Sequence, residues 1–389
     1  MPLSIIETPY HSLKQGGLPE GCKGCVKGEK LVLFVTGVCP ATCFFCPISE
    51  EKKNKDVMYA NEQELAGTPE EHMALVIDEA KAHKATGAGI TGGDPLARLE
   101  RTCKYIRALK REFGKEFHIH LYTPLILVND ITMAKLYEAG LDEIRFHPSL
   151  QSEKFWPRMA IARKYNWKIG IEIPIFPDKV EETKRLIDFA AKEKVTEFLN
   201  LNELEISERT IEEFEKRNYK TKRSDSYAIE GSKDAALAIM RHAQQYAMPV
   251  HFCTTVLKDR VQMGNRIIRR AENTALPFDE VDGEGLLTRG AVYFDHLPGF
   301  AYNKRLKSLT KEQRAEDVDK LLRVLAWLTA QGMPSDAGVI DAHRLRVLLS
   351  AEALRELAPD MKKRFPAAKP AVVTEYPTSD SFIVELEKL

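Results

Sequence analysis

The sequence lacks three features that would place it in a specialised class of proteins. Its 389 residues carry 57 Lys and Arg against 57 Asp and Glu, so a net charge of zero gives no overall attraction to nucleic acid or an anionic membrane. No apolar run approaches the roughly 18 residues that a membrane span requires. The first residues also lack the charged and apolar regions of a signal peptide. We therefore expect a cytoplasmic protein without a membrane partner.

Cysteine is also scarce, and its placement is more informative than its number. Five of the seven cysteines lie in one short stretch near the start of the chain, namely Cys22, Cys25, Cys39, Cys43 and Cys46. The other two are isolated. In a reducing cytosol, such clustering indicates metal ligation rather than disulfides.

Short β-rich runs alternate with helical patterns over the first two thirds of the chain. The expected strands are 31–36, 89–91, 117–122, 143–147, 168–175, 198–202 and 249–254, and the clearest helices are 68–87, 129–139, 180–192 and 233–246. Thr68 and Glu71 form a capping box, and we expect Gly87 to end that helix. This alternation implies an α/β fold with parallel strands, and the number of units favours a partial (βα)6 TIM-like barrel.

The pattern changes towards the C-terminus, which divides the chain into three expected regions. These are an N-terminal segment with a cysteine knuckle (1–30), the barrel (31–255) and a small helical or α+β appendage (256–389). Within the appendage we expect a β-hairpin arm, two helices and a final strand pair, at 286–294, 311–331, 351–365 and 371–389.

The loop after the first strand, Val38–Pro47, carries three cysteines in a Cx3Cx2C arrangement. Three closely spaced thiolates can wrap three irons of a cubane cluster and leave the fourth iron free to bind a cofactor or substrate. A structural zinc site normally needs four ligands, commonly supplied as CxxC pairs. The spacing of Cys39, Cys43 and Cys46 therefore favours a [4Fe–4S] cluster.

This loop, with the aromatic Phe45 before its last cysteine, resembles the signature of the radical S-adenosylmethionine (SAM) superfamily. The resemblance implies that Cys39, Cys43 and Cys46 hold the cluster, that the open iron chelates SAM, and that the backbone around Phe45 approaches the adenine. It also implies a radical-SAM-type barrel. In that superfamily, one electron from a flavodoxin- or ferredoxin-like donor leads to a 5′-deoxyadenosyl radical, which abstracts hydrogen from the substrate.

A second short motif, TGGDP at residues 91–95, ends the next strand, where the superfamily has a Gly-Gly-Glu-Pro-like turn. Paired glycines let backbone carbonyls approach a ligand closely, here the SAM amino group. We expect Gly92 and Gly93 to serve in this way. Asp94 stands where glutamate is commoner, and we expect it to contribute to cofactor binding chiefly through its backbone.

Several polar side chains lie near the ends of other strands, where barrel enzymes place their chemistry. A polar residue between apolar neighbours in a parallel strand needs a partner or lines a cavity. We expect Arg145, Glu172 and Asn200 to bind cofactor, with Arg145 pairing the SAM carboxylate. The alternatives are His118, His120, Tyr122, His147 and Asn202.

A second metal site is a further hypothesis. Cys22 and Cys25 form a CxxC before the first strand, and His251 and Cys253 share one face of the last barrel strand. If the barrel brings these strands together, the four side chains could bind zinc or an auxiliary iron–sulfur cluster. Redox thiols or a plain turn are the alternative for the CxxC. Cys103, amid apolar helical neighbours, is expected in the core.

The chain also resembles an archaeal-type branch of radical SAM proteins related to pyruvate formate-lyase activating enzymes. The similarity covers about residues 20–270 and rests on GCxxC before the cluster loop and on the segments 56–62, 200–205 and 251–259. The appendage and the CxxC favour a macromolecular substrate, RNA or protein, with tRNA as one candidate.

Three other readings remain open. The first two are a glycyl-radical-enzyme activase and an enzyme that acts on a small molecule. A non-catalytic iron–sulfur or zinc protein that binds partners is a remote alternative.

A basic helical segment, 254–270, could contact a phosphate backbone, although a solvated face is the preferred interpretation.

Overall fold

The computed structural model describes residues 3–334 and 336–389. Its contacts divide the chain into two compact units, Met1–Arg266 and Ile267–Leu389. The division lies later than the expected boundary at residue 255, because the following residues pack on the barrel. Asn265, for example, donates a hydrogen bond to the Val26 carbonyl at 2.7 Å. Within the described ranges, none of the helices has the length and apolar character needed to cross a bilayer.

The first unit is built on one curved sheet of eleven strands. The strands are β1 (Ile5–Glu7), β2 (Leu13–Gln15), β3 (Lys30–Phe34), β4 (Tyr59–Ala60), β5 (Gln63–Glu64), β6 (Gly87–Thr91), β7 (His118–Pro124), β8 (Glu143–His147), β9 (Lys168–Ile175), β10 (Phe198–Glu203) and β11 (Val250–Cys253). Their order is β1-β2-β11-β10-β9-β8-β7-β6-β3-β4-β5. From β11 to β3 all neighbours are parallel, and no pairing in the described part of the chain joins these two strands. The expected partial barrel is therefore confirmed.

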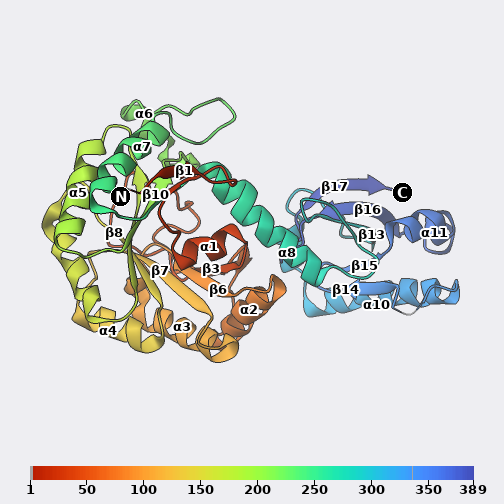
Figure 1. Ribbon diagram of the computed structural model, residues 1–389. Helices are drawn as coiled ribbons and strands as arrows, with labels where there is room; N and C mark the ends of the chain where they lie inside the picture. Colours follow the sequence, from red (N-terminus) through yellow and green to blue (C-terminus); the bar gives the residue numbers. More distant parts are fainter. Residues whose placement is uncertain (1–2, 335) are drawn as a thin grey trace. The chain divides into compact units, whose positions relative to one another are not determined.

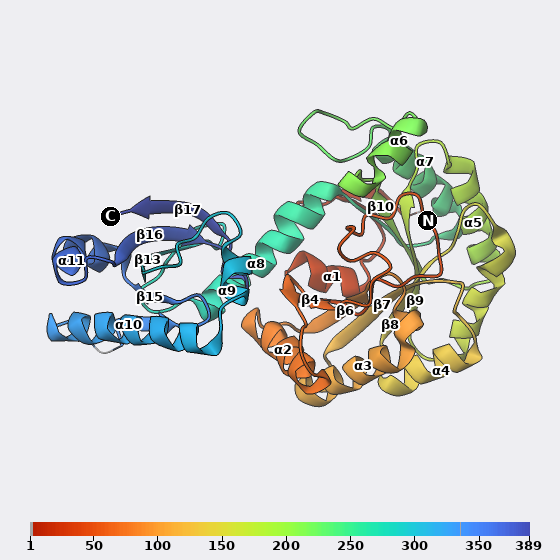
Figure 2. The same ribbon diagram turned by 180° about the vertical axis from the view of Figure 1, so that it is seen from behind.

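Helices cover the outer face of this sheet, as Figures 1 and 2 show for α3, α4 and α5. The helices of the unit are α1 (Glu20–Val26), α2 (Pro69–Ala82), η1 (Pro95–Arg98), α3 (Leu99–Phe113), α4 (Asp130–Ala139), η2 (Glu153–Lys164), α5 (Val180–Lys192), η3 (Glu208–Thr210), α6 (Ile211–Lys216), α7 (Ser232–Ala243), η4 (Gln244–Tyr246), the π-helix η5 (Leu257–Met263) and α8 (Gly264–Thr274), which continues into the second unit. Their apolar faces pack on alternate strand residues such as Ile90, Ile119 and Ile171, which are fully buried.

Local signals explain where some helices begin, but not where all of them end. The capping box of α2 is present as expected, with the Glu71 amide donating to the Thr68 hydroxyl. The expectation that Gly87 ends this helix is wrong. The helix ends at Ala82, Lys84 takes a left-handed φ of 49°, and Gly87 is the first residue of β6. Cys103 lies in the core, as expected.

The N-terminal segment belongs to the barrel unit rather than forming a separate region. Strand β2 pairs with β11, which extends the sheet beyond the parallel strands. Helix α1 contacts β3, β6 and β7 and lies near the beginnings of these strands. The cysteine knuckle expected at Cys22 and Cys25 is therefore a helical turn inside this unit.

The second unit contains an antiparallel sheet and three helices. Its elements are β12 (Glu280–Val281), β13 (Leu287–Tyr293), α9 (Tyr302–Lys307), α10 (Lys311–Ala330), β14 (Gly338–Asp341), β15 (Arg346–Leu349), α11 (Ala351–Arg364), β16 (Lys369–Glu375) and β17 (Ile383–Lys388). The sheet order is β14-β15-β13-β16-β17, with β12 beside β13. The expected α+β appendage is confirmed. Strand β13 pairs antiparallel with β12, the strand before it, as one arm of a hairpin, and it is also an inner strand between β15 and β16.

Candidate functional site

The three loop cysteines line one cavity of about 310 Å³ at the carboxyl ends of the barrel strands. Cys39, Cys43 and Cys46 are each partly exposed. Burial raises the pKa of Cys43 to about 11, and the neighbouring cysteines add to this rise. Burial likewise raises the pKa of Cys39. A cation or cluster is therefore needed to keep these sulfurs deprotonated, and its binding would release protons.

The chemistry of these donors fits an iron–sulfur cluster better than a single ion. Within residues 3–334 and 336–389, no three His, Cys, Asp or Glu side chains are arranged to hold one metal ion. A cubane cluster is bound through three different irons, so its cysteines stand farther apart than the ligands of a single ion. Three thiols that line one cavity supply the three ligands that such a cluster needs.

The TGGDP turn is pressed against the backbone that leads into the cysteine loop. The Gly93 amide donates to the Thr36 carbonyl at 2.7 Å, and the Asp94 amide donates to the Val38 carbonyl at 2.9 Å. A Cβ atom on Gly93 would lie 2.5 Å from the Val38 carbonyl oxygen. Gly92 has a φ of +150° and lines the same cavity. Only glycine permits this close approach of two backbones.

Asp94 has a different place from the one expected. It is fully buried and is absent from the cavity lining. One carboxylate oxygen accepts from the Thr123 hydroxyl at 2.8 Å and from the Leu96 amide at 3.0 Å, which caps η1. The other oxygen has no hydrogen-bond partner, and burial raises the pKa of Asp94 to about 6. The structure thus gives this carboxylate a capping role.

Phe45 forms part of an aromatic wall beside the cysteines. Its ring centroid lies 4.9 Å from that of Phe176 and 5.7 Å from that of His147. A second cavity of about 340 Å³ shares Cys43, Phe45 and His147 with the first. The aromatic residue of the motif therefore borders two adjoining cavities.

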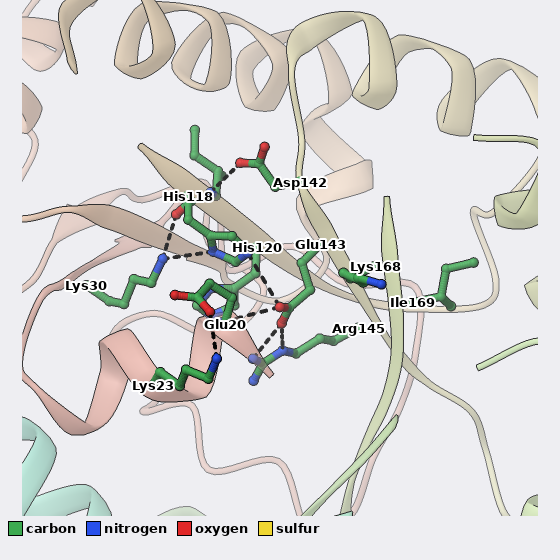
Figure 3. A network of polar contacts seen from close by, with 12 residues as sticks. Glu20, Lys23, Lys30, His118, His120, Asp142, Glu143, Arg145, Lys168 and Ile169 are labelled. Carbon is green, nitrogen blue, oxygen red and sulfur yellow. Dashed lines mark hydrogen bonds and ion pairs between the residues drawn. The ribbon is translucent and has the colours of Figure 1, made fainter. Parts of the chain in front are cut away.

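Arg145 lines the cavity, but its guanidinium is already paired on two sides. Arg145 Nε donates to Glu143 Oε1 at 2.6 Å, as Figure 3 shows, and Nη1 donates to Glu172 Oε2 at 2.8 Å. Arg145 and Glu143 are almost completely buried. An arginine held between two carboxylates is less available to a cofactor carboxylate than the sequence suggested.

Asn200 does not line the cavity, whereas Asn202 does. The Asn200 side-chain oxygen lies 2.9 Å from His251 Nδ1 and accepts from Cys22 Sγ at 3.7 Å. Residues 200 and 202 share one face of β10, but only the second lies close enough to the carboxyl end of the strand. The expectation that Asn200 contacts a cofactor is therefore not supported.

The structure gives no support for the second metal site. Cys22 and His251 both point at the amide oxygen of Asn200, which needs donors and leaves no shared position for a cation. Cys253 accepts from Gln262 at 3.7 Å instead. Burial raises the pKa of Cys22 and the pKa of Cys25. It raises the pKa of Cys253 to about 12 and lowers the pKa of His251 to about 4. Cys22, His251 and Cys253 are buried in the packed interior of the barrel unit, and their hydrogen bonds are with protein groups.

Sequence reasoning assigned no site role to two charged residues at the cavity rim. Lys258 comes from the π-helix η5, and its ammonium lies 3.3 Å from Glu205 at the end of β10. Both residues line the cavity. A π-helix is rare and often marks a functional position, but no local sequence signal announces one. The basic segment was visible in the sequence, whereas the inward direction of Lys258 was not.

Comparisons with known proteins agree with this geometry. Residues 33–190 match the family model described as Radical SAM superfamily. The chain is 39% identical over 379 residues to a Methanocaldococcus jannaschii protein named "Putative glycyl-radical enzyme activating enzyme MJ0021", with 95% of this chain and 92% of that protein covered.

Two solved structures are also similar, with TM-scores too low to support a family assignment. Methylornithine synthase gives a TM-score of 0.37 at 14% identity, covering 61% of this chain and 77% of that one. Coproporphyrinogen III oxidase from Escherichia coli gives 0.31 at 12% identity, covering 86% and 91%. The family assignment rests on the full-length relative and on the matched family model, and both agree with the cysteine loop. This chain belongs to the radical SAM superfamily.

Proposed function

We propose that this radical SAM enzyme acts on a protein, and that it generates a radical on a glycine of a partner polypeptide. The observation that carries the proposal is the 39% identity to the protein named as a glycyl-radical enzyme activating enzyme, which extends over 95% of this chain. The C-terminal appendage is compatible with this proposal. Because 92% of that relative is covered, the appendage is no departure from it.

RNA becomes the weaker candidate among macromolecular substrates. The basic segment 254–270 was the feature that favoured a phosphate backbone. Lys258 in this segment is paired with Glu205 at 3.3 Å, and Arg266 with Glu62 at 2.5 Å. Cations that already have carboxylate partners add little attraction for phosphates. These contacts of Lys258 and Arg266 lie within the barrel unit and weaken the case for RNA.

The residues around the first cavity can be given roles in this chemistry. Cys39, Cys43 and Cys46 would hold three irons of a [4Fe–4S] cluster, and the turn at Gly92 and Gly93 would receive the SAM amino group. When bound, the cluster and SAM supply a 5′-deoxyadenosyl radical that abstracts hydrogen. Phe45 and its aromatic neighbours would exclude water from this region.

The overall reaction balances with one electron and one hydrogen atom. A flavodoxin- or ferredoxin-like protein supplies the electron, and the glycine Cα–H bond supplies the hydrogen atom. The products are methionine, 5′-deoxyadenosine and a glycine-centred radical. A cytoplasmic location belongs to this proposal, because a reducing medium keeps the cysteines free to bind iron.

The test is anaerobic. The protein is reconstituted with iron and sulfide and given SAM, dithionite and a synthetic peptide whose central glycine carries deuterium at Cα. We expect deuterium to appear in 5′-deoxyadenosine, and we expect Cys43→Ala to yield none. A peptide with alanine at the same position is the matched control. SAM cleavage without deuterium transfer, together with stimulation by tRNA, would contradict a protein substrate.

A further inference from the structure

A chain of charged side chains crosses the barrel interior and ends in the cavity. It begins at Lys30 and His118, near the starts of β3 and β7, where Lys30 Nζ lies 2.8 Å from His118 Nδ1 (Figure 3). His118 Nε2 lies 3.5 Å from Glu143, which in turn accepts from Arg145. Arg145 then donates to Glu172. These two carboxylates leave the guanidinium little freedom to move.

The cavity end of this chain offers donors and acceptors side by side. The Glu172 side chain is 13% exposed and lines the cavity, and its Oε1 accepts from Asn202 Nδ2 at 3.0 Å. Asn202 also lines the cavity, and among the described residues nothing donates a hydrogen bond to its side-chain oxygen. The Tyr122 hydroxyl lies 3.4 Å from Arg145 Nη1 and completes the floor.

A glycine offers an enzyme no side chain to recognise. Its only polar groups are the backbone N–H and C=O of the segment that carries it, so a site for glycine needs acceptors and donors for amides. Glu172 and the Asn202 oxygen supply acceptors, and the second hydrogen of Asn202 Nδ2 supplies a donor. The contact of Glu172 with Arg145 holds this floor in place.

We infer that this floor is the subsite for the main chain of the substrate, with Glu172 accepting amide N–H groups, the Asn202 side-chain amide pairing with an N–H and a carbonyl, and Arg145 holding Glu172 in place. The inference rests on the proposed function. It makes Glu172 and Asn202 the residues that select an unbranched peptide segment, and it assigns the interior charges to substrate binding rather than to SAM.

Helix α1 supports the floor from below and acts as a positioning element. The Gly21 amide donates to Glu143 Oε2 at 3.2 Å. A Cβ atom at Gly21 would lie 2.8 Å from Glu143 Oε1 and would also collide with the Arg145 guanidinium. Glycine is therefore required for α1 to approach the ion pair. The GCxxC segment thus has a role that needs no metal.

Two substitutions test the floor directly. Glu172→Gln keeps the size of the side chain but removes the charge, and Asn202→Ala removes the free acceptor from a partly exposed position. With the deuterated peptide, we expect each variant to raise the KM for the peptide at least tenfold. The change that SAM causes in the EPR signal of the cluster is recorded for each variant, and it reports separately whether SAM still binds.

The control is Glu197→Gln, which removes a surface carboxylate paired with Lys168 at 2.6 Å. Its KM for the peptide should not change. If the unmodified protein transfers deuterium and both floor variants keep its KM, the subsite is wrong while the proposed function stands. If the variants lose SAM binding as well, the floor serves the cofactor and the inference is overturned. Absence of transfer by the unmodified protein contradicts the proposed function and the subsite with it.

Discussion

At the scale of single residues, Asp94 carries a charge where the surrounding structure disfavours one. Burial raises its pKa from 3.8 to about 6, although Thr123 and Leu96 donate to one of its oxygens. The folded protein therefore binds a proton that the unfolded chain has lost between these values. It follows that the free energy of unfolding falls as the pH rises through this interval.

We expect Asp94 to lower the free energy of unfolding by about 2 kcal/mol between about pH 4 and pH 7. Asp94→Asn keeps an acceptor for Thr123 and Leu96 but removes the charge, so this part of the pH dependence should disappear. Urea denaturation of the cluster-free protein at both pH values measures this difference in the free energy of unfolding. Asp130→Asn, at an exposed position of α4, should leave the pH dependence of the free energy of unfolding unchanged. An unchanged slope in the Asp94 variant would show that the carboxylate is already solvated.

At the scale of elements, the turn after β6 and the loop after β3 hold each other in place. Their contact consists of backbone atoms, which cannot move aside as a flexible side chain can. We expect Gly93→Ala to lower the free energy of unfolding by about 1–3 kcal/mol, because the new Cβ would lie 2.5 Å from the Val38 carbonyl. Since Val38 precedes Cys39, formation of 5′-deoxyadenosine should also fall at least tenfold.

A matched control for this turn is Gly17→Ala, because a Cβ atom at Gly17 would meet nothing within 4 Å. This variant should keep the stability and the activity of the unmodified protein. Denaturation by urea and product analysis by mass spectrometry provide the two measurements. Equal activity of the two alanine variants would mean that the turn does not position the cysteine loop.

At the scale of the whole molecule, the chain has two units with separate interiors. The second unit contains a buried ion cluster in which Glu375 accepts from Arg346 at 2.6 and 2.8 Å and from Arg289 at 3.3 Å. Removing one partner of such a cluster leaves buried charges uncompensated. Stability of the second unit should therefore depend on Glu375, while the barrel should not.

We expect Glu375→Ala to destabilise the second unit by about 3–5 kcal/mol. In calorimetry, only the transition of that unit should shift, and SAM cleavage at low temperature should be retained. Glu387→Ala breaks an exposed pair with Arg355 and should cost less than about 1 kcal/mol. A shift of both transitions by Glu375→Ala would show that the two units unfold together.

The sequence by itself determined the class of chemistry and the class of fold. Cysteine spacing, the paired glycines and the alternation of strands with helices are local patterns, because each depends on residues close together in the chain. They were sufficient to predict a partial barrel with a cysteine loop at the carboxyl end of its first parallel strand. Helix boundaries were less secure, as the early end of α2 shows.

Only the tertiary structure decided which polar residues meet in the cavity. Alternation along a strand indicates which side chains share a face, but it does not give their depth in the barrel. This is why Asn202 lines the cavity and Asn200 does not. The partners of Arg145 and the position of α1 likewise depend on strands far apart in the sequence, whose register is set by packing rather than by any local motif.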